Sequence, residues 1–152
     1  MILLDVNILV HAFRREGPDH ERYAAWLTEA ARGSEELALH DVTVTGFVRI
    51  VTNPRILRPP APSSAAVAFI DRLVAAPRTR WLSGGPDSWT HLSDLLQRDR
   101  GLVGNLVPDA FLAALARTHR CRLATADRGF TRFPAVDWFD PLAPEHEQGR
   151  RQ

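Results

Sequence analysis

The sequence predicts an α/β protein, specifically a three-layer α/β/α sandwich with a central, mostly parallel sheet of four to five strands. Short apolar runs typical of buried strands alternate along the chain with longer segments of helical periodicity. Chains of this pattern usually build a parallel sheet with helices on both faces. A length of 152 residues suits one domain with its own core. We assign residues 1–142 to that domain and expect residues 143–152, rich in Arg and Gln, to be disordered.

The first half of the chain contains two strand–helix transitions. An apolar run opens the sequence and passes directly into a helical pattern, and Gly33 follows the second helix, as glycine often does. Asn53-Pro54 stops the last helix of this half, because the residue before a proline avoids helical geometry. The predicted elements are a strand at 2–5, helices at 6–15 and 19–32, a strand at 37–39 and a helix at 41–51.

The second half continues the alternation. A proline-rich loop precedes a helix that we expect Ser63 or Ser64 to cap. Paired glycines turn the chain into the next helix, and Pro108 falls in the first turn of the helix after that, where proline is tolerated. The predicted elements are a helix at 63–76, a strand at 79–82, helices at 88–98 and 105–118, and strands at 121–125 and 136–139.

Composition excludes several functions. All 19 basic residues are arginine, so the chain lacks the lysine that P-loops and Schiff-base enzymes require. A net charge of +1 argues against a large sequence-independent DNA-binding face. No apolar stretch approaches the roughly 20 residues that span a bilayer, and no signal peptide is visible. The single cysteine, Cys121, is interpreted as a buried strand residue and fits a reducing compartment, so we expect a cytoplasmic protein without membrane contact.

Three aspartates follow strands or open a helix. Asp5 ends the first apolar run, Asp127 follows the run at 123–126, and Asp109 lies in the first turn of the helix at 105–118. The carboxyl ends of parallel strands and the helix starts after them form the functional edge of such a sheet. Three carboxylates gathered there would repel one another unless a cation joined them. The pattern therefore points to a hard divalent ion such as Mg²⁺ or Mn²⁺.

Each aspartate also has a simpler interpretation. Asp109 would favour the helix dipole wherever it lay in the first turn, and Asp127 suits a plain turn before Arg128-Gly129. Asp5 is harder to explain in this way, because a buried carboxylate without a basic partner is costly. A phosphatase or phospho-receiver domain would also gather aspartates at strand ends, but such domains usually need a lysine, which this chain lacks.

Five further polar residues are candidates for supporting roles. Asn7 and Thr125 could orient water or phosphate, although both residue types are common in local hydrogen bonds. Asn105 could do the same, or cap a helix. Arg49 and Arg55 could line the approach of a phosphate-bearing ligand, or form solvated faces and ion pairs with glutamates.

Four short motifs contain most of these candidates. They are Leu4-Asp5-Val6-Asn7-Ile8-Leu9, Phe47-Val48-Arg49-Ile50-Val51-Thr52-Asn53-Pro54-Arg55, Asn105-Leu106-Val107-Pro108-Asp109-Ala110 and Thr125-Ala126-Asp127-Arg128-Gly129-Phe130. In this order and at these separations, they resemble the motifs of PIN-domain proteins, and specifically of VapC-type toxins from bacterial toxin–antitoxin pairs. The resemblance covers most of residues 1–142.

The resemblance implies a PIN-like fold and a metal-dependent ribonuclease that acts as a toxin and hydrolyses phosphodiester bonds in RNA. It implies Asp5, Asp109 and Asp127 as catalytic and metal-binding residues, with Mg²⁺ or Mn²⁺ as cofactor. We expect Asp5 and Asp109 to be direct ligands and Asp127 to act through water or at a second site. The resemblance also implies a cognate antitoxin protein and often a homodimer.

The chain departs from the family at one position. Members commonly carry a glutamate three residues before Arg49, where this chain has Gly46. Asp41 begins the same predicted helix but lies more than one turn away, so it is a poor substitute. Two alternatives follow. Either one metal held by three carboxylates suffices, which we favour, or the chain is a catalytically weak or silent PIN-fold module that still binds an antitoxin or RNA.

Overall fold

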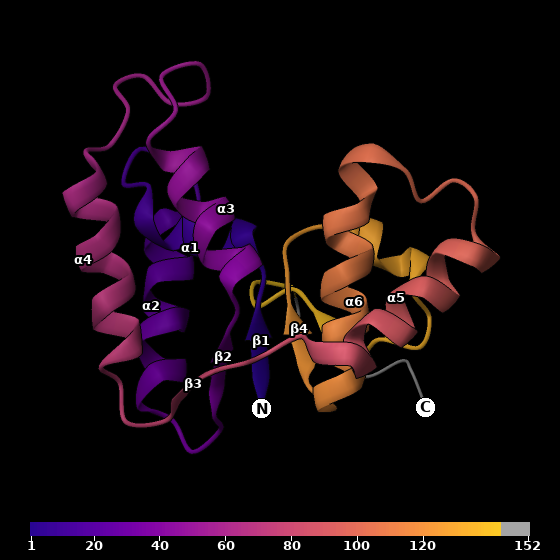
Figure 1. Cartoon of the computed structure of the whole chain (residues 1–152). Helices are drawn as coiled ribbons and strands as arrows, with labels where there is room; N and C mark the ends of the chain where they lie inside the picture. Colours follow the sequence, from indigo (N-terminus) through magenta and orange to yellow (C-terminus); the bar gives the residue numbers. More distant parts are fainter. Residues whose placement is uncertain (144–152) are drawn as a thin grey trace.

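The protein folds into three layers, with a five-stranded sheet between two groups of helices (Figure 1). The computed structural model describes residues 1–143, so the predicted disorder of the tail lies, apart from Ala143, outside the described residues. Every strand pair is parallel, and the order across the sheet is β3-β2-β1-β4-β5. The strands are β1 (Ile2–Leu4), β2 (Leu37–Leu39), β3 (Thr79–Trp81), β4 (Arg122–Ala124) and β5 (Trp138–Phe139).

Four helices cover one face of the sheet and two cover the other (Figure 1). This arrangement confirms the predicted three-layer sandwich. None of the described helices is both long and apolar enough to be a candidate membrane span. The first group contains α1 (Val6–Phe13), α2 (His20–Arg32), α3 (Asp41–Val51) and α4 (Ser63–Val74), and the second contains α5 (Gly85–Arg98) and α6 (Val107–His119). Two 3₁₀ turns complete the second side: η1 (Gly104–Leu106) directly precedes α6, and η2 (Arg128–Arg132) follows β4.

The central strand β1 shows why the molecule has an apolar cluster on each face of the sheet. Ile2 and Leu4 pack with the helices α1 to α4, whereas Leu3 packs with α5 and α6. Successive side chains of a strand point to opposite faces, so a strand that is apolar at every position must be covered on both sides. Large aromatic residues follow the same division: Trp26, Phe47 and Phe69 pack in the first cluster, and Phe111 and Trp138 in the second.

Several predicted elements are longer than the observed ones, and the reason is clear for the first helix and the last strand. The first helix ends at Phe13 rather than at residue 15, because Arg14 adopts an extended backbone with φ −83° and ψ 98°. The last strand, predicted at 136–139, is shorter because the N–H of Val136 bonds back to the carbonyl of Phe133 in a turn. Both errors lie at element ends, where local hydrogen bonding decides the boundary.

The sequence misjudged one helix cap and the starts of two helices, one of which, predicted at 88–98, already begins at Gly85. Neither Ser63 nor Ser64 caps α4, whose N-cap is Pro62 and which has no side-chain cap bond, because Ser63 is already helical. The helix predicted from residue 105 begins two residues later. Gly104 has a positive φ of 55°, which favours glycine, and it opens a separate 3₁₀ turn that contains Asn105.

Candidate functional site at the carboxyl edge of the sheet

The candidate site lies where β1 and β4 end. These strands are neighbours, and Leu4 faces Ala124 in their register. The residues that follow, Asp5 and Thr125, therefore lie side by side where both chains leave the sheet. The N–H of Asp5 still donates to the carbonyl of Ala124 at 3.1 Å, which holds the aspartate against the end of β4.

Asp5 is a buried carboxylate, with 6% of its surface exposed. Its Oδ1 accepts the backbone N–H of Val6 at 2.6 Å and so caps α1. Its Oδ2 accepts from Thr125 Oγ1 at 2.6 Å and from Asn7 Nδ2 at 2.7 Å. Burial nevertheless raises the pKa of Asp5 above its ordinary value, although these bonds act in the other direction, and the charge of Asp127 raises it further.

Asn7 and Thr125 tie together the two loops that carry Asp5 and Asp127. The Asn7 side chain donates to Thr125 Oγ1 at 3.0 Å and accepts the N–H of Ala126 at 3.0 Å. Thr125 Oγ1 also accepts the N–H of Asp127 at 3.0 Å, and its side chain is fully buried. The local hydrogen-bonding interpretation of both residues is therefore correct, and its effect is to hold two of the aspartates in fixed positions.

Asp109 approaches the same space from the first turn of α6. Its side chain is partly buried, and its pKa rises to about 6, chiefly through desolvation and then through the charges of Asp5 and Asp127. Asp127 is exposed, and its Oδ1 accepts the N–H of Gly129 at 2.7 Å, which caps η2. The turn interpretation of Asp127 thus holds, and the carboxylate also influences the other two.

The three aspartates line one open pocket of about 710 Å³ between α1, α3 and α6. Three of the five predicted supporting residues line it as well: Asn7, Asn105 and Arg49. Thr125 lies beneath the pocket, bonded to Asp5, and Arg55 is not part of its lining. Asn105 does not cap α6, whose N-cap is Leu106 and which has no side-chain cap bond.

In the described part of the chain, the three carboxylates of the pocket form no ion pair. Within residues 1–143, none of the ion pairs involves Asp5, Asp109 or Asp127. Within the same residues there is also no group of three or more Asp, Glu, His or Cys side chains that could hold a metal ion by themselves. Mg²⁺ does not require one, since it usually takes one or two carboxylates and keeps several waters. The partly desolvated and mutually repulsive carboxylates of this pocket are therefore of the kind that suits a hard divalent cation.

Gly46 lies in the α3 wall of this pocket. At this position the family resemblance predicts a glutamate, which this chain lacks. A Cβ there would stand 3.0 Å from Cγ2 of Val6, so the valine would have to give way by a few tenths of an ångström. The absence of a side chain at Gly46 therefore allows α3 to pack closely against the start of α1.

The two predicted arginines have different surroundings. Arg49 is exposed on α3 and lines the pocket, whereas Arg55 lies in the turn after α3, where its N–H bonds to Asn53 Oδ1 at 2.9 Å. Neither forms one of the ion pairs within residues 1–143, so pairing with glutamates is not found there. Both guanidinium groups are available to an anionic ligand.

Sequence reasoning missed His11, which lines the pocket from α1. The signal was present, because His11 lies one helical turn after Asn7 and residues four apart share a helix face. Its ring stacks on Tyr23 with centroids 4.8 Å apart and planes at 14°. The Tyr23 hydroxyl in turn donates to Asp140 Oδ1 at 3.1 Å, so the imidazole rests on a fixed support.

Comparisons with known sequences agree on one family. A family model for the PIN domain matches residues 2–136. The VapC ribonuclease Mb2897 of Mycobacterium bovis is 37% identical over 142 residues, which cover 93% of this chain and 96% of that protein. Ribonuclease VapC31 of Mycobacterium tuberculosis is 33% identical over 141 residues, with 93% and 99% covered.

Solved structures agree on the fold. VapBC2 from Rickettsia felis, bound to a DNA fragment from their promoter, superposes with a TM-score of 0.67 at 19% identity, covering 92% of this chain and 98% of that chain. VapC20 of Mycobacterium tuberculosis, described as a Sarcin-Ricin loop cleaving toxin, gives a TM-score of 0.63 at 15% identity, with 86% and 93% covered. At these identities the likeness concerns the fold alone.

Proposed function

The chain belongs to the PIN-domain family, and we propose that it is a metal-dependent endoribonuclease that acts as the toxin of a toxin–antitoxin pair. Relatives with 31–37% identity over 93% of the chain are named as VapC ribonucleases. The observation that carries the proposal is the pocket itself. Three carboxylates line it, and within residues 1–143 no basic side chain pairs with them. Such a pocket suits a cation and, through it, a phosphate.

We assign Mg²⁺ or Mn²⁺ to this pocket, with Asp5 and Asp109 as direct ligands. Oδ2 of Asp5 already accepts two hydrogen bonds, whereas Oδ1 accepts one and keeps a lone pair for a ligand. None of the hydrogen bonds in the described part of the chain ends on the Asp109 carboxylate, and this supports its role as the more open ligand. The ion would supply a water of lowered pKa and neutralise charge on the phosphate.

The remaining residues of the pocket would position the reactants. Asp127 is exposed at the rim and would hold a metal-bound water or a second ion. Arg49 would bind a phosphate, because a guanidinium group forks onto two oxygens at once. Arg55 would extend the same approach along the RNA, and the Asn105 amide would donate to phosphate or water from the opposite wall.

A separate groove supports the proposal of an antitoxin partner. It lies between α1, α2 and α4 and has a volume of about 540 Å³. An apolar helix face fits such a groove, and basic side chains at its rim favour an acidic segment. Structural neighbours that include VapBC assemblies add support. The apolar lining includes Phe13, Leu27, Phe69 and Leu73, and the basic lining Arg15, Arg32 and Arg72.

A homodimer is also part of the proposal. Trp81 and Trp89 are large apolar side chains with 48% and 63% of their surface exposed, and Val67 and Val74 add 51% and 47%. Exposed apolar surface of this kind supports an interface with a second chain, although single exposed residues are common on monomers. Sedimentation of the purified chain would test this part separately.

Gly46 favours the alternative, a catalytically weak or silent module with the same fold. RNA cleavage separates the two cases. The purified chain should cleave total bacterial RNA in Mg²⁺ or Mn²⁺, and EDTA should abolish cleavage. Asp109→Asn should abolish it without loss of folding, while Glu35→Gln, at the opposite edge of the sheet, should cleave as the wild type does.

Two results would reject the metal nuclease. One is cleavage that survives EDTA or Asp109→Asn, and the other is no cleavage with either metal, which would establish the silent module. The toxin role has its own test, since expression of the chain should arrest growth of a bacterial host. Arrest that persists in Asp5→Asn, Asp109→Asn would show that the toxicity is not catalytic.

A further inference from the structure

An ion pair outside the pocket joins two loops that contribute to its wall. Arg132 Nε donates to Asp99 Oδ2 at 2.6 Å and Nη2 donates to Oδ1 at 3.1 Å. The contact is therefore bidentate, the geometry in which an arginine–carboxylate pair is strongest and most directional. Both side chains are about 40% exposed. An isolated exposed pair usually contributes little, and an ideal bidentate one is the exception.

The two partners belong to segments that lead directly to the pocket. Asp99 follows α5 and begins the loop to η1, where Asn105 lines the pocket. Arg132 is the last residue of η2, which Asp127 caps. Near the pair, the loop after α5 enters the core through Leu102 (4% exposed), and the η2 segment enters it through Phe130 (1%) and Phe133 (4%). The ion pair is the polar link between the Asn105 and Asp127 sides.

Gly101 shows that the loop is shaped around the guanidinium group. Its N–H donates to Asp99 Oδ1 at 2.9 Å, so the carboxylate accepts from both the arginine and its own loop. These two donors hold the pKa of Asp99 below its ordinary value. A Cβ at position 101 would stand 2.5 Å from Nη2 of Arg132, too close for both to remain. A side chain there would displace the guanidinium group from Asp99.

We propose that Arg132 and Asp99 are positioning residues, whose ion pair clamps η2 to the 99–106 loop and so sets the separation of Asp127 and Asn105 across the pocket. The pair touches neither metal nor RNA in this account. It acts through Asp127, whose carboxylate is exposed and is otherwise fixed by the hydrogen bonds of its own loop. The proposal rests on the proposed function in one respect, namely that the pocket binds a divalent ion.

Three variants test the clamp, with one matched control. Arg132→Ala removes the guanidinium group, and Gly101→Ala keeps both charges but blocks their contact. Asp99→Arg, Arg132→Asp reverses the pair and should restore part of the link. The control is Arg98→Ala, which removes a more exposed arginine–aspartate pair of 2.7 Å within α5, between Arg98 and Asp94. Hydrogen exchange of the loops and calorimetric Mn²⁺ titration are both measured on the full chain.

Arg132→Ala and Gly101→Ala should each speed amide exchange in residues 99–106 and 127–133 and weaken Mn²⁺ binding by roughly three- to tenfold, below the 10- to 100-fold typical of residues that contact metal ligands directly. Arg98→Ala should change neither. A merely structural pair would lower the melting temperature and leave the Mn²⁺ affinity unchanged, and that result would overturn the proposal. Unchanged exchange in both loops would overturn it as well. If the wild type bound no Mn²⁺, the proposed function would fail, and the exchange data would still decide whether the clamp exists.

Discussion

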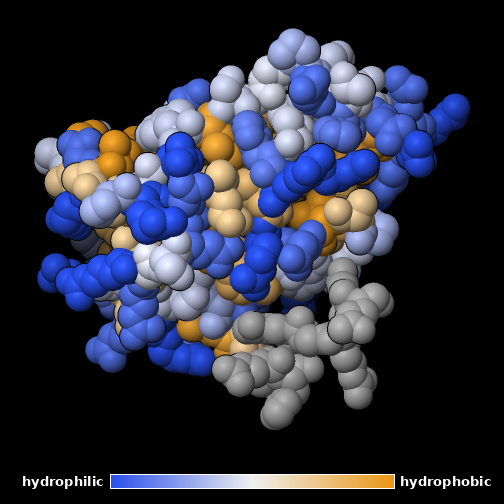
Figure 2. Space-filling view, turned by 90° about the horizontal axis from the view of Figure 1, so that it is seen from below, coloured by the Kyte–Doolittle hydropathy of each residue, from blue (hydrophilic) through white to orange (hydrophobic). Residues whose placement is uncertain are grey.

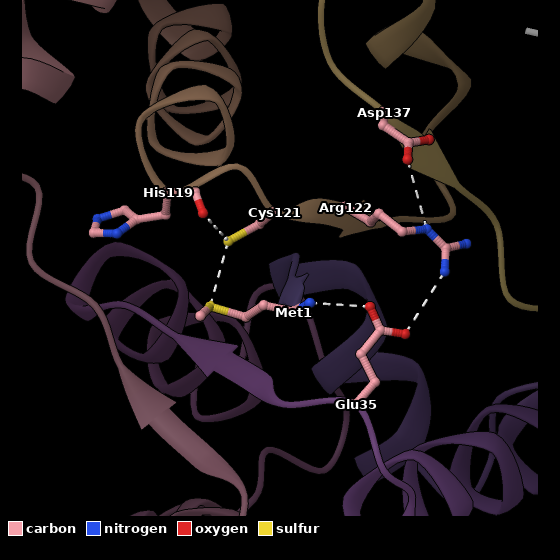
Figure 3. A network of polar contacts seen from close by, with 6 residues as sticks. All are labelled: Met1, Glu35, His119, Cys121, Arg122 and Asp137. Atoms are coloured by element: carbon pink, nitrogen blue, oxygen red, sulfur yellow. Dashed lines mark hydrogen bonds and ion pairs between the residues drawn. The ribbon is translucent and has the colours of Figure 1, made fainter. Parts of the chain in front are cut away.

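The two edges of the sheet differ in whether their acidic side chains are paired with cations. At the amino edge, acidic side chains have cationic partners (Figure 3). Glu35 accepts from the Met1 amino group at 3.0 Å and lies 3.7 Å from Arg122. Arg122 also lies 3.6 Å from Asp137, and its guanidinium group stacks over a core ring, that of Phe139, at 4.3 Å. Figure 2 shows this end of the molecule, where hydrophilic residues predominate and hydrophobic residues form smaller patches between them.

The carboxyl edge gathers charge of one sign. Asp5, Asp109 and Asp127 line its pocket, and within residues 1–143 none of them has an ion-pair partner. Desolvation and mutual repulsion raise the pKa of Asp109 to about 6. The same sheet therefore has an amino edge whose charges are paired and a carboxyl edge whose carboxylates repel one another. We call them the neutralised edge and the strained edge. The unpaired carboxylates of the strained edge are ones that a bound cation could compensate, and this difference supports the proposed metal site at that edge.

Removing the hydroxyl that supports the strained edge should have the largest effect on stability. Thr125→Val deletes a donor to Asp5 and an acceptor for Asn7, all within a buried region. The carboxylate that remains would be short of a partner, so we expect a loss of about 1–3 kcal/mol in the free energy of unfolding, measured with urea. RNA cleavage should fall with it, because Asp5 loses its orientation.

Thr43→Val is the matched control for this change. Thr43 is also fully buried, but among the described residues its Oγ1 has no hydrogen-bond partner. Replacing it with valine removes an unsatisfied polar atom and should leave stability equal or higher. Equal losses in the two variants would show that Thr125 contributes only by filling space, and the comparison between the edges would lose one of its supports.

Neutralising Asp109 should raise stability without metal, in a pH-dependent way. Its pKa is about 6 in the folded chain against an ordinary value of 3.8, so between these values the folded state binds more protons than the unfolded state. Wild-type stability should therefore fall as the pH rises through this window. Asp109→Asn cannot titrate, and its advantage should grow from near zero below the window to on the order of 1 kcal/mol above it, after discounting for solvent screening.

Urea unfolding in EDTA across that pH range measures this advantage. A variant that is less stable than the wild type above the window would mean that Asp109 is held by a favourable interaction, and the edge would not be strained.

The smallest effect is expected at the neutralised edge. Glu35→Gln removes two exposed ion pairs, with Met1 and Arg122, and should change the free energy of unfolding by about 0.5 kcal/mol or less. Cleavage and Mn²⁺ affinity should stay at wild-type levels. A large loss of either would show that the two edges are coupled, against the view that only one of them is functional.

The sequence supported the order of elements and the edge on which the aspartates lie, because both follow from local patterns. Strand and helix periodicity, together with the rule for parallel sheets, require no knowledge of packing. The position of Asn105 could not be obtained in this way, since it depends on Gly104 adopting a positive φ and opening a separate turn. The predicted serine cap of α4 was wrong for a similar reason, because Ser63 is already the first residue of the helix.

Which residues line the pocket depends on how the helices and strands pack, and local sequence patterns do not contain this information. Arg49 lines the pocket from α3 and Arg55 does not, because Arg55 lies in the turn beyond the end of that helix. The burial of Thr125 beneath Asp5 likewise follows from the β1–β4 register, which a single sequence does not specify. His11 could have been found, since its spacing from Asn7 places both on one helix face.

Calorimetric titration with Mn²⁺, above the pKa of Asp109, tests the central claim most directly. The wild-type chain should bind the ion in the pocket, and Asp109→Asn should lose that binding, because it removes the open carboxylate. Glu35→Gln should bind as the wild type does, because the charges at the amino edge are already paired. Absence of binding by the wild type, or equal binding by Asp109→Asn, would contradict the account, since the unpaired carboxylates would then have a purpose other than holding a metal.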